Sequence, residues 1–282
     1  MPDIQKLLTE SSQLLQARSD SAQLDVEILL CHVLNKDRSH LRAWPEKKLS
    51  DKQLNQFKSL FNKRLQGTPI AYLTGKREFW SRDFITTPAV LIPRPETETL
   101  IELCLNLIPN RSSISLLDLG TGSGIIAITL AAELNSIQVT AVDQSKEALA
   151  LAQQNASLNN TKDIQFIQSD WFTQVPQQQF DFILSNPPYI DPADHHLQQG
   201  DVRFEPSSAL IAQQKGLQDI IDITNKSQNF LKQNGYLILE HGYDQQQSVH
   251  DILKTQHYSN IHCLTDLAGQ DRVSYAQWQA KI

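Results

Sequence analysis

Four consecutive residues, Asn186, Pro187, Pro188 and Tyr189, follow a strand-like apolar run. An amide or exocyclic amine nitrogen is a poor nucleophile because its lone pair is delocalised. The Asn186 side-chain oxygen and the Pro187 carbonyl could each accept one N–H hydrogen of such a group and turn its lone pair toward a methyl donor. The prolines fix the loop, and the Tyr189 ring offers a face to a flat group. The pattern predicts methylation of a planar nitrogen; the alternative is a Pro-Pro turn with an exposed tyrosine.

A glycine-rich loop links a strand-like run at positions 114–119 to an apolar helical pattern that begins at Ile125. The loop consists of Gly120, Thr121, Gly122, Ser123 and Gly124. Strand, glycine loop and helix together bring backbone N–H groups against a nucleotide-like ligand. The next strand pattern, at positions 137–142, is followed by Asp143, where a carboxylate can accept both hydroxyls of a ribose. The sequence therefore predicts a nucleotide-like cofactor, although such loops also serve as tight turns.

The glycine spacing separates two classes of cofactor. NAD-binding loops follow the pattern Gly-x-Gly-x-x-Gly, and the third glycine of that pattern falls on Ile125 here. This mismatch, together with the tetrapeptide after a later strand, favours S-adenosyl-L-methionine. Asp170 and Trp171 follow the strand pattern at positions 164–167 and could contact an adenine, with Trp171 against its ring and Asp170 near its amine. The alternative is that Trp171 only caps the core.

Longer motifs extend over most of the chain. Positions 91–98 are Leu-Ile-Pro-Arg-Pro-Glu-Thr-Glu, positions 117–124 are Leu-Asp-Leu-Gly-Thr-Gly-Ser-Gly, and positions 185–190 are Ser-Asn-Pro-Pro-Tyr-Ile. Phe-Glu-Pro at positions 204–206 and the segment 266–273 add two more matches. On these motifs the chain resembles the release factor glutamine methyltransferases of the HemK type, also called protein-(glutamine-N5) methyltransferases.

The resemblance implies methyl transfer from S-adenosyl-L-methionine to the glutamine side-chain amide in the Gly-Gly-Gln motif of class I peptide chain release factors. It implies that the cofactor contacts Gly120, Thr121, Gly122, Gly124, Asp143 and Trp171. Our predicted cofactor-binding set adds Ser123 and Asn186. The predicted catalytic residues, which hold the glutamine amide, are Asn186, Pro187 and Tyr189, and Pro188 joins them in the predicted substrate-binding loop.

Two motif regions have open roles. Arg94, Glu96 and Glu205 could line the entrance to the glutamine pocket, or they could serve in helix capping and salt bridges, so they stay outside the predicted catalytic set. The family often has an acidic residue before a Gly-Leu pair where this chain has Lys215 before Gly216. This departure does not involve the predicted catalytic residues. The role of the loop around Lys215 stays undefined.

Charge and periodicity divide the chain into modules. Residues 1–92 contain 14 Lys and Arg against 10 Asp and Glu, a net charge of +4, and the remainder carries −10 of the total of −6. A basic module joined to an acidic one suggests an acidic partner for the first, although solvated helix faces explain the bias equally well. Residues 1–75 have helical periodicity, including a capping-box pattern at Ser50 and Gln53, and predict a partner-binding helical bundle.

The rest of the chain predicts an α/β fold. Residues 76–92 have short aromatic and apolar runs typical of a β-hairpin linker. Residues 93–282 alternate strand and helix patterns, which predicts a Rossmann-like class I methyltransferase domain with a seven-stranded sheet. Its last two strands, expected at positions 258–264 and 272–278, would form an antiparallel pair.

Other features exclude several protein classes. No apolar run has the length of a membrane span and the N-terminus lacks a signal pattern, so we expect a cytoplasmic protein. Cys31, Cys104 and Cys263 have neither disulfide-framework nor zinc-site spacing and are expected to be small core residues. Adjacent His195 and His196 are expected to point apart, so no metal site is predicted.

Three functions remain open at this point. The first is methylation of a release factor glutamine by an enzyme that acts as a monomer. The second is N6-adenine methylation of DNA or RNA, since the tetrapeptide suits an exocyclic amine. No long basic, aromatic-rich insertion is present to grip a phosphate backbone, so we expect no stable nucleic acid partner. The third is a binding module without turnover, which the intact motifs disfavour.

Overall fold

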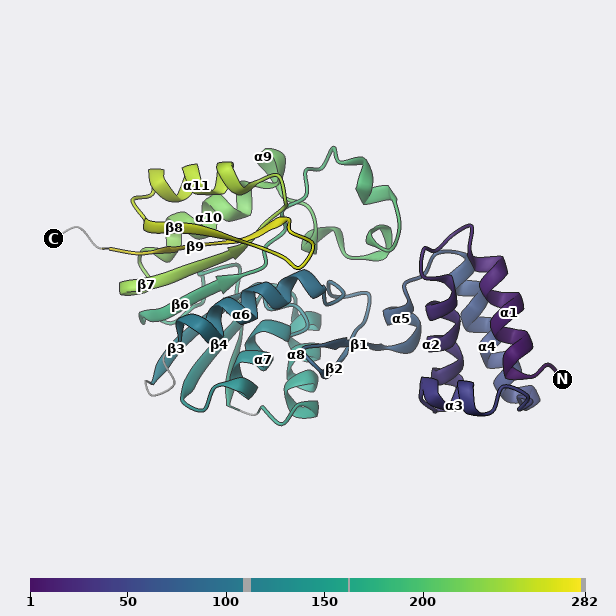
Figure 1. The fold of residues 1–282 in the computed structure, drawn as a ribbon. Helices are drawn as coiled ribbons and strands as arrows, with labels where there is room; N and C mark the ends of the chain where they lie inside the picture. Colours follow the sequence, from purple (N-terminus) through teal and green to yellow (C-terminus); the bar gives the residue numbers. More distant parts are fainter. Residues whose placement is uncertain (109–112, 162, 280–282) are drawn as a thin grey trace. The chain divides into compact units, whose positions relative to one another are not determined.

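The computed structural model describes residues 1–108, 113–161 and 163–279 (Figure 1). Contacts divide the chain into two units: Met1–Lys76 with Gln198–Phe204, and Arg77–Leu197 with Glu205–Ile282. Each unit has a hydrophobic core of its own. Across the described residues, no helix is both long enough and apolar enough to cross a membrane.

The first unit is helical. Its helices are α1 (Ile4–Leu15), α2 (Ala22–Leu34), α3 (Arg38–Ala43), α4 (Asp51–Leu65) and α5 (Ile70–Thr74). The predicted capping box begins α4: the Ser50 side chain accepts from the Gln53 N–H, and the Gln53 side chain accepts from the Ser50 N–H. Apolar stripes on α1, α2 and α4 enclose a core that includes the fully buried Ile4, Leu29 and Phe57.

A short segment from late in the sequence also belongs to this helical unit. It is the stretch Gln198–Phe204, which includes the single-turn helix η3 (Val202–Phe204). Arg64 Nη1 donates to Asp201 Oδ1 at 3.0 Å, and Arg203 Nη2 donates to the Gln66 carbonyl at 3.1 Å. The Arg64 side chain is 9% exposed and the Asp201 side chain 40% exposed, so the bond between them is only partly shielded from water.

The second unit begins with a β-hairpin, formed by β1 (Lys76–Phe79) and β2 (Arg82–Ile85). Phe79 and Phe84 are buried in the same cluster as the sheet residues that follow. The buried Asn155 holds the end of the hairpin, because its Oδ1 accepts from the Ile85 N–H at 2.7 Å and its Nδ2 donates to the Ile85 carbonyl at 3.1 Å.

A seven-stranded sheet forms the centre of the second unit, as predicted. Its strands are β3 (Ile114–Leu119), β4 (Ile137–Asp143), β5 (Ile164–Gln168), β6 (Phe180–Ser185), β7 (Leu231–Glu240), β8 (Ser259–Thr265) and β9 (Asp271–Gln277). The strand order is β5-β4-β3-β6-β7-β9-β8. Neighbours from β5 to β7 are parallel, and β9 pairs antiparallel with both β7 and β8. The predicted fold class, including the terminal antiparallel pair, is confirmed.

Helices cover both faces of this sheet (Figure 1). The longer helices are α6 (Glu98–Leu107), α7 (Ile125–Glu133), α8 (Lys146–Leu158), α10 (Gln218–Ser227) and α11 (Gln246–Thr255). Shorter turns are η1 (Pro95–Thr97), η2 (His195–Gln198), η4 (Ser207–Ala209) and α9 (Gln213–Gly216). Successive strand residues point to opposite faces, so Leu116 packs with α6 and α7 while Leu117 packs with α10 and α11.

The cysteines fit this packing in part. Cys104 is fully buried in α6, as expected for a small core residue. Cys31 and Cys263 are only partly buried, and all three thiols are free.

Candidate active site

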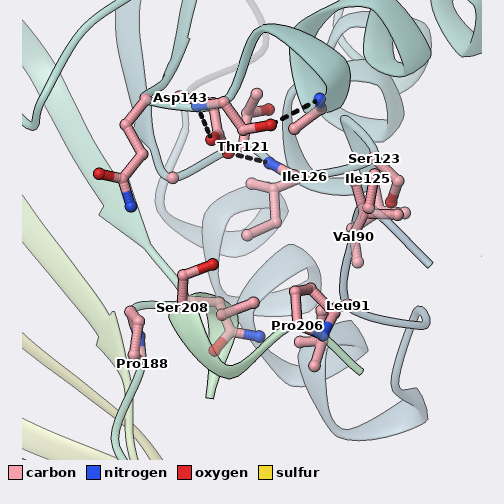
Figure 2. A pocket seen from close by; sticks show the side chains of 18 of the residues that line it. Val90, Leu91, Thr121, Ser123, Ile125, Ile126, Asp143, Pro188, Pro206 and Ser208 are labelled. Atoms are coloured by element: carbon pink, nitrogen blue, oxygen red, sulfur yellow. Dashed lines mark hydrogen bonds between the residues drawn. The ribbon is translucent and has the colours of Figure 1, made fainter. Parts of the chain in front are cut away.

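A pocket of about 240 Å³ lies where the parallel strands β3, β4, β5 and β6 end (Figure 2). This carboxyl edge is where open α/β sheets bind ligands. The predicted residues that line the pocket are Gly120, Thr121, Gly122, Ser123, Asp143, Trp171, Asn186 and Pro188. The predicted residues outside the lining are Gly124, Pro187 and Tyr189. Four strand ends that are separate in the sequence thus contribute to a single cavity.

Asp143 joins the glycine loop to the start of α8. Its Oδ2 accepts from the Gly122 N–H and its Oδ1 accepts from the Ser145 N–H, both at 2.9 Å. Burial raises the pKa of Asp143 above its ordinary value, and these N–H bonds oppose the rise. Each carboxylate oxygen has a further lone pair, so Asp143 can still accept hydrogen bonds from a ligand in the pocket.

Asp118, at the penultimate position of β3, anchors the glycine loop through a hydrogen bond. It is fully buried, and its Oδ2 accepts from Thr121 Oγ1 at 2.6 Å. Burial raises the pKa of Asp118 to about 7. Asp118 therefore holds Thr121 in place at the pocket wall.

Trp171 and Gly120 approach closely on the pocket lining. A Cβ added to Gly120 would lie 3.3 Å from Cζ3 of the Trp171 ring, so a larger residue would crowd the indole. The indole N–H, which can only donate, bonds to the carboxylate of Asp219 near the start of α10. Asp219 lines the pocket and was not predicted from the sequence.

Gly124, at the end of the glycine loop, has a packing role between two helices. Its φ is +86°, and an added Cβ would lie 2.7 Å from Ile128 Cδ1 and 3.1 Å from Ala152 Cβ. The absence of a side chain at Gly124 thus lets α7 pack against α8. Nearby, Asn155 Nδ2 donates to the Ser123 carbonyl at 2.9 Å and fixes the other side of the loop.

The tetrapeptide after β6 is held at both ends by buried polar residues. Asn186 Nδ2 donates to Thr97 Oγ1 at 3.3 Å, and the Tyr189 hydroxyl donates to Glu240 Oε1 at 3.4 Å. Thr97 and Glu240 are fully buried. Burial raises the pKa of Glu240 to about 7. The Tyr189 ring packs against the core on the side of α10 and α11.

Two loops complete the pocket wall and were missed as site residues. They contribute Ala89, Val90, Leu91, Ile92 and Pro93 from one side, and Pro206, Ser208 and Ala209 from the other. Glu205, whose side chain is buried, links the two loops. Its Oε2 accepts from the Ile92 N–H at 2.9 Å, and its carboxylate forms an ion pair with Arg94. The sequence signal existed, because both loops overlap motifs that carry the family resemblance.

Gly216 packs closely against the backbone of the tetrapeptide. It lies in the loop around Lys215, which departs from the family pattern. Its φ is +80°, and an added Cβ would lie 2.0 Å from the Tyr189 carbonyl oxygen. Gln245 Nε2 donates to that same carbonyl at 3.0 Å and to the Lys215 carbonyl at 3.2 Å. The loop therefore fixes the backbone of Tyr189, whatever side chain precedes the glycine.

Replacing Gly216 by Ala is expected to destabilise the fold by about 1–3 kcal/mol, because the new methyl group strains a left-handed backbone and displaces the Tyr189 carbonyl. Denaturant unfolding measures the loss. Gly269→Ala is the matched control, since Gly269 has a φ of +77° and no heavy atom within 4 Å of its added Cβ. An equal loss in both variants would show that backbone strain alone, and not contact with Tyr189, sets the cost.

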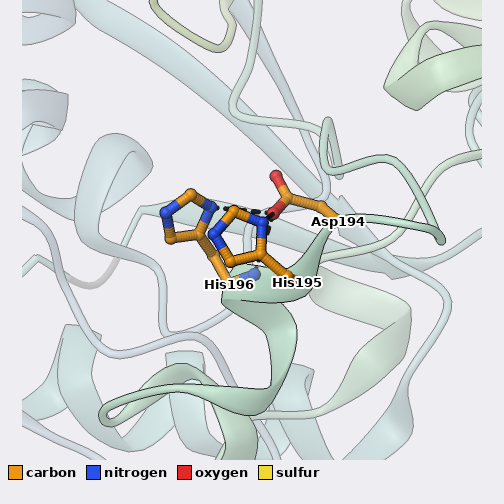
Figure 3. A group of neighbouring side chains, drawn as sticks. All are labelled: Asp194, His195 and His196. Carbon is orange, nitrogen blue, oxygen red and sulfur yellow. Dashed lines mark hydrogen bonds and ion pairs between the residues drawn. The ribbon is translucent and has the colours of Figure 1, made fainter.

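Asp194, His195 and His196 form a cluster at the start of η2 (Figure 3). Asp194 Oδ1 lies 2.8 Å from His196 Nδ1, and the two imidazole centroids are 3.9 Å apart. The expectation that these histidines point apart is wrong, because the tight turn places both rings beside the same carboxylate. The histidine side chains are 74% and 63% exposed. Two exposed histidines beside one partly buried carboxylate do not form an enclosed ligand set, and we infer no metal site from them.

Two family models match the chain. The PrmC N-terminal domain matches residues 6–75, and the methyltransferase small domain matches residues 97–234. A release factor glutamine methyltransferase of Shewanella oneidensis is 47% identical over 268 residues, which are 95% of this chain and 93% of that protein. Another from Aliivibrio fischeri is 46% identical over 278 residues, 98% of this chain and 97% of that protein.

A solved structure is similar at the level of the fold. It is the Thermus thermophilus 16S rRNA N2 G1207 methyltransferase in complex with AdoMet and guanosine, with a TM-score of 0.53 and 18% identity. The similarity covers 72% of this chain and 50% of that one. The sequence relatives, in contrast, extend over both units described above.

Proposed function

The chain belongs to the family of release factor glutamine methyltransferases, and on this premise we propose that it transfers a methyl group from S-adenosyl-L-methionine to a release factor glutamine. The methyl acceptor is the side-chain amide nitrogen of the Gly-Gly-Gln motif in class I peptide chain release factors. The observation that carries this proposal is that Asn186 lines the same pocket as the glycine loop and Asp143.

The task of the site is to make an unreactive amide nitrogen attack. The Asn186 oxygen and the Pro187 carbonyl each accept one hydrogen of the glutamine NH₂ group, which turns the nitrogen lone pair out of the amide plane. Orientation of this kind is worth roughly 7–11 kcal/mol in favourable cases. An alkylated, protonated amide loses its extra proton readily, so the proposal needs no dedicated general base.

The pocket residues fit the proposed cofactor. S-adenosyl-L-methionine supplies a methyl group bonded to a positively charged sulfur. Asp143 has lone pairs that suit ribose hydroxyls, and the Trp171 ring lies on the lining, where it suits a flat base. The close approach of Gly120 to Trp171 supports this assignment, because a side chain at Gly120 would fill the space beside the ring.

We assign partner binding to the helical unit. Residues 1–92, which contain the helices of this unit and the hairpin that follows, carry an excess of Lys and Arg that is consistent with an acidic surface on the release factor. The proposal includes action as a monomer in the cytoplasm, where release factors take part in translation.

One experiment tests this function directly. The chain is incubated with S-adenosyl-L-methionine carrying a labelled methyl group and a class I release factor, and separately with that factor carrying Gln→Ala in its Gly-Gly-Gln motif. We expect label only on the unaltered factor. Equal labelling of both proteins would refute the assigned acceptor. An adenine-containing oligonucleotide serves as a third arm, and salt-sensitive methylation of it would favour the N6-adenine alternative.

A further inference from the structure

Among the residues that the structure describes, the carboxamide of Asn186 is hydrogen-bonded at one end only. Its Nδ2 donates to Thr97 Oγ1 at 3.3 Å, and Asn186 itself lines the pocket. A carboxamide has a donor end and an acceptor end. With the donor end on Thr97, the acceptor end is the one left to receive hydrogens from a substrate.

Thr97 Oγ1 accepts from Asn186 Nδ2 only if the hydroxyl hydrogen of Thr97 points to a group other than Asn186. A hydroxyl has one hydrogen, so a threonine that donates to another group can only accept from Asn186. The group available is Glu240, the last residue of β7, whose ionised form is stabilised by the Thr97 hydroxyl. In its ionised form Glu240 accepts and cannot donate, and this form sets the direction of the bonds from Asn186 through Thr97 to Glu240.

Glu240 also contacts the other end of the tetrapeptide. Its Oε1 accepts from the Tyr189 hydroxyl at 3.4 Å, and Arg272 stabilises its charge while Glu96 opposes it. Glu240 is fully buried, and its Oε2 has no geometrically defined hydrogen-bond partner among the described residues. Such an oxygen has no bulk water to bind, so a hydroxyl directed toward the carboxylate is strongly favoured.

We propose that Thr97 and Glu240 are positioning residues that fix the Asn186 carboxamide with its oxygen toward the substrate amide. The inference rests on the proposed function, since the direction of this carboxamide matters only if Asn186 receives a substrate hydrogen. A reversed carboxamide would place an NH₂ group against the substrate NH₂ group, donor against donor. Thr97 and Glu240 thereby select one of two orientations that are nearly identical in shape.

Two substitutions at Thr97 test the proposal. Thr97→Val removes the hydroxyl and keeps the branched shape, whereas Thr97→Ser keeps the hydroxyl. We expect Thr97→Val to lower kcat for release factor methylation by about 10- to 100-fold. This is the size of the loss seen in metal sites when the hydrogen-bond partner that orients a ligating side chain is removed, and Thr97 has the corresponding orienting role toward Asn186. Cofactor affinity, measured by calorimetry, should stay unchanged in both variants, and Thr97→Ser should retain most of the wild-type kcat.

A buried threonine outside this network provides the control. Thr129 lies in α7, is fully buried, and its hydroxyl has no hydrogen-bond partner among the described residues. Thr129→Val should therefore leave kcat unchanged. Glu240→Gln supplies the second test, because a glutamine amide can donate to Thr97 and no longer imposes one direction. Its effect should not add to that of Thr97→Val, since both act through the same carboxamide.

The outcomes separate this inference from the function on which it rests. No methyl transfer by the wild-type chain would remove the proposed function and the role of Asn186 with it. Transfer by the wild type that persists at full kcat in Thr97→Val would overturn the positioning role alone. Equal losses in Thr97→Val and Thr97→Ser, or a parallel loss of cofactor binding, would indicate a structural role and also overturn it.

Discussion

Asn186→Ala is expected to lower kcat for methyl transfer by about 100- to 1,000-fold, the range found when one preorganised hydrogen-bonding group is removed from an active site. In the proposed mechanism the lost oxygen acts on the substrate nitrogen as its lone pair becomes available, so we expect the loss to fall on the chemical step. Although Asn186 also belongs to the predicted cofactor-binding set, cofactor affinity should remain within about twofold of the wild-type value, because removal of an interaction made in the transition state leaves ground-state binding in place. Steady-state kinetics and calorimetry measure the two quantities separately.

The control for this change is Asn229→Ala, an exposed asparagine after α10 and outside the pocket lining. It should behave as the wild type. If Asn186→Ala lost cofactor affinity and kcat to the same degree, Asn186 would support the fold of the pocket and the proposed role in catalysis would be wrong.

Asp143→Ala is expected to have the opposite profile, with the cofactor dissociation constant raised by at least about 100-fold. Hydrogen bonds to a charged group contribute roughly 1.5–3 kcal/mol each, and the proposed ribose contacts use two. The variant also loses the bonds from the Gly122 and Ser145 N–H groups. The glycine loop is then less well ordered, which lowers cofactor affinity further. At saturating cofactor, kcat should recover to within a few-fold of the wild-type value.

Calorimetry with S-adenosyl-L-methionine checks the affinity of the Asp143 variant. Asp163→Ala, an exposed carboxylate just before β5, is the matched control and should bind as the wild type does. An unchanged dissociation constant in Asp143→Ala would exclude Asp143 from the cofactor site.

Sequence patterns were sufficient to place candidate site residues at the pocket where they directly follow a buried strand. Asp143 and Asn186 both lie at the ends of apolar runs, and parallel topology brings such ends together at one edge. The seven strands were predicted for the same reason. The short helices α3 and α5 were not, because six and five residues are too few to display an apolar stripe.

The parts of the site that depend on distant contacts were not predicted. Asp219 reaches the pocket from α10, and its bond to Trp171 joins positions far apart in the chain. Thr97 lies within the motif at positions 91–98, and Glu240 is the last residue of β7. Their relation to Asn186 and Tyr189 depends on which buried oxygens meet in three dimensions, which no local periodicity encodes.

The membership of Gln198–Phe204 in the helical unit has a consequence for exchanging modules between relatives. The chain passes from one unit to the other at positions 76/77, 197/198 and 204/205, so no single cut separates the two. A chimera joined only after Lys76 would pair Arg64 and Gln66 with a foreign version of Asp201 and Arg203. Replacing the helical unit by that of a relative therefore requires transplanting both stretches together.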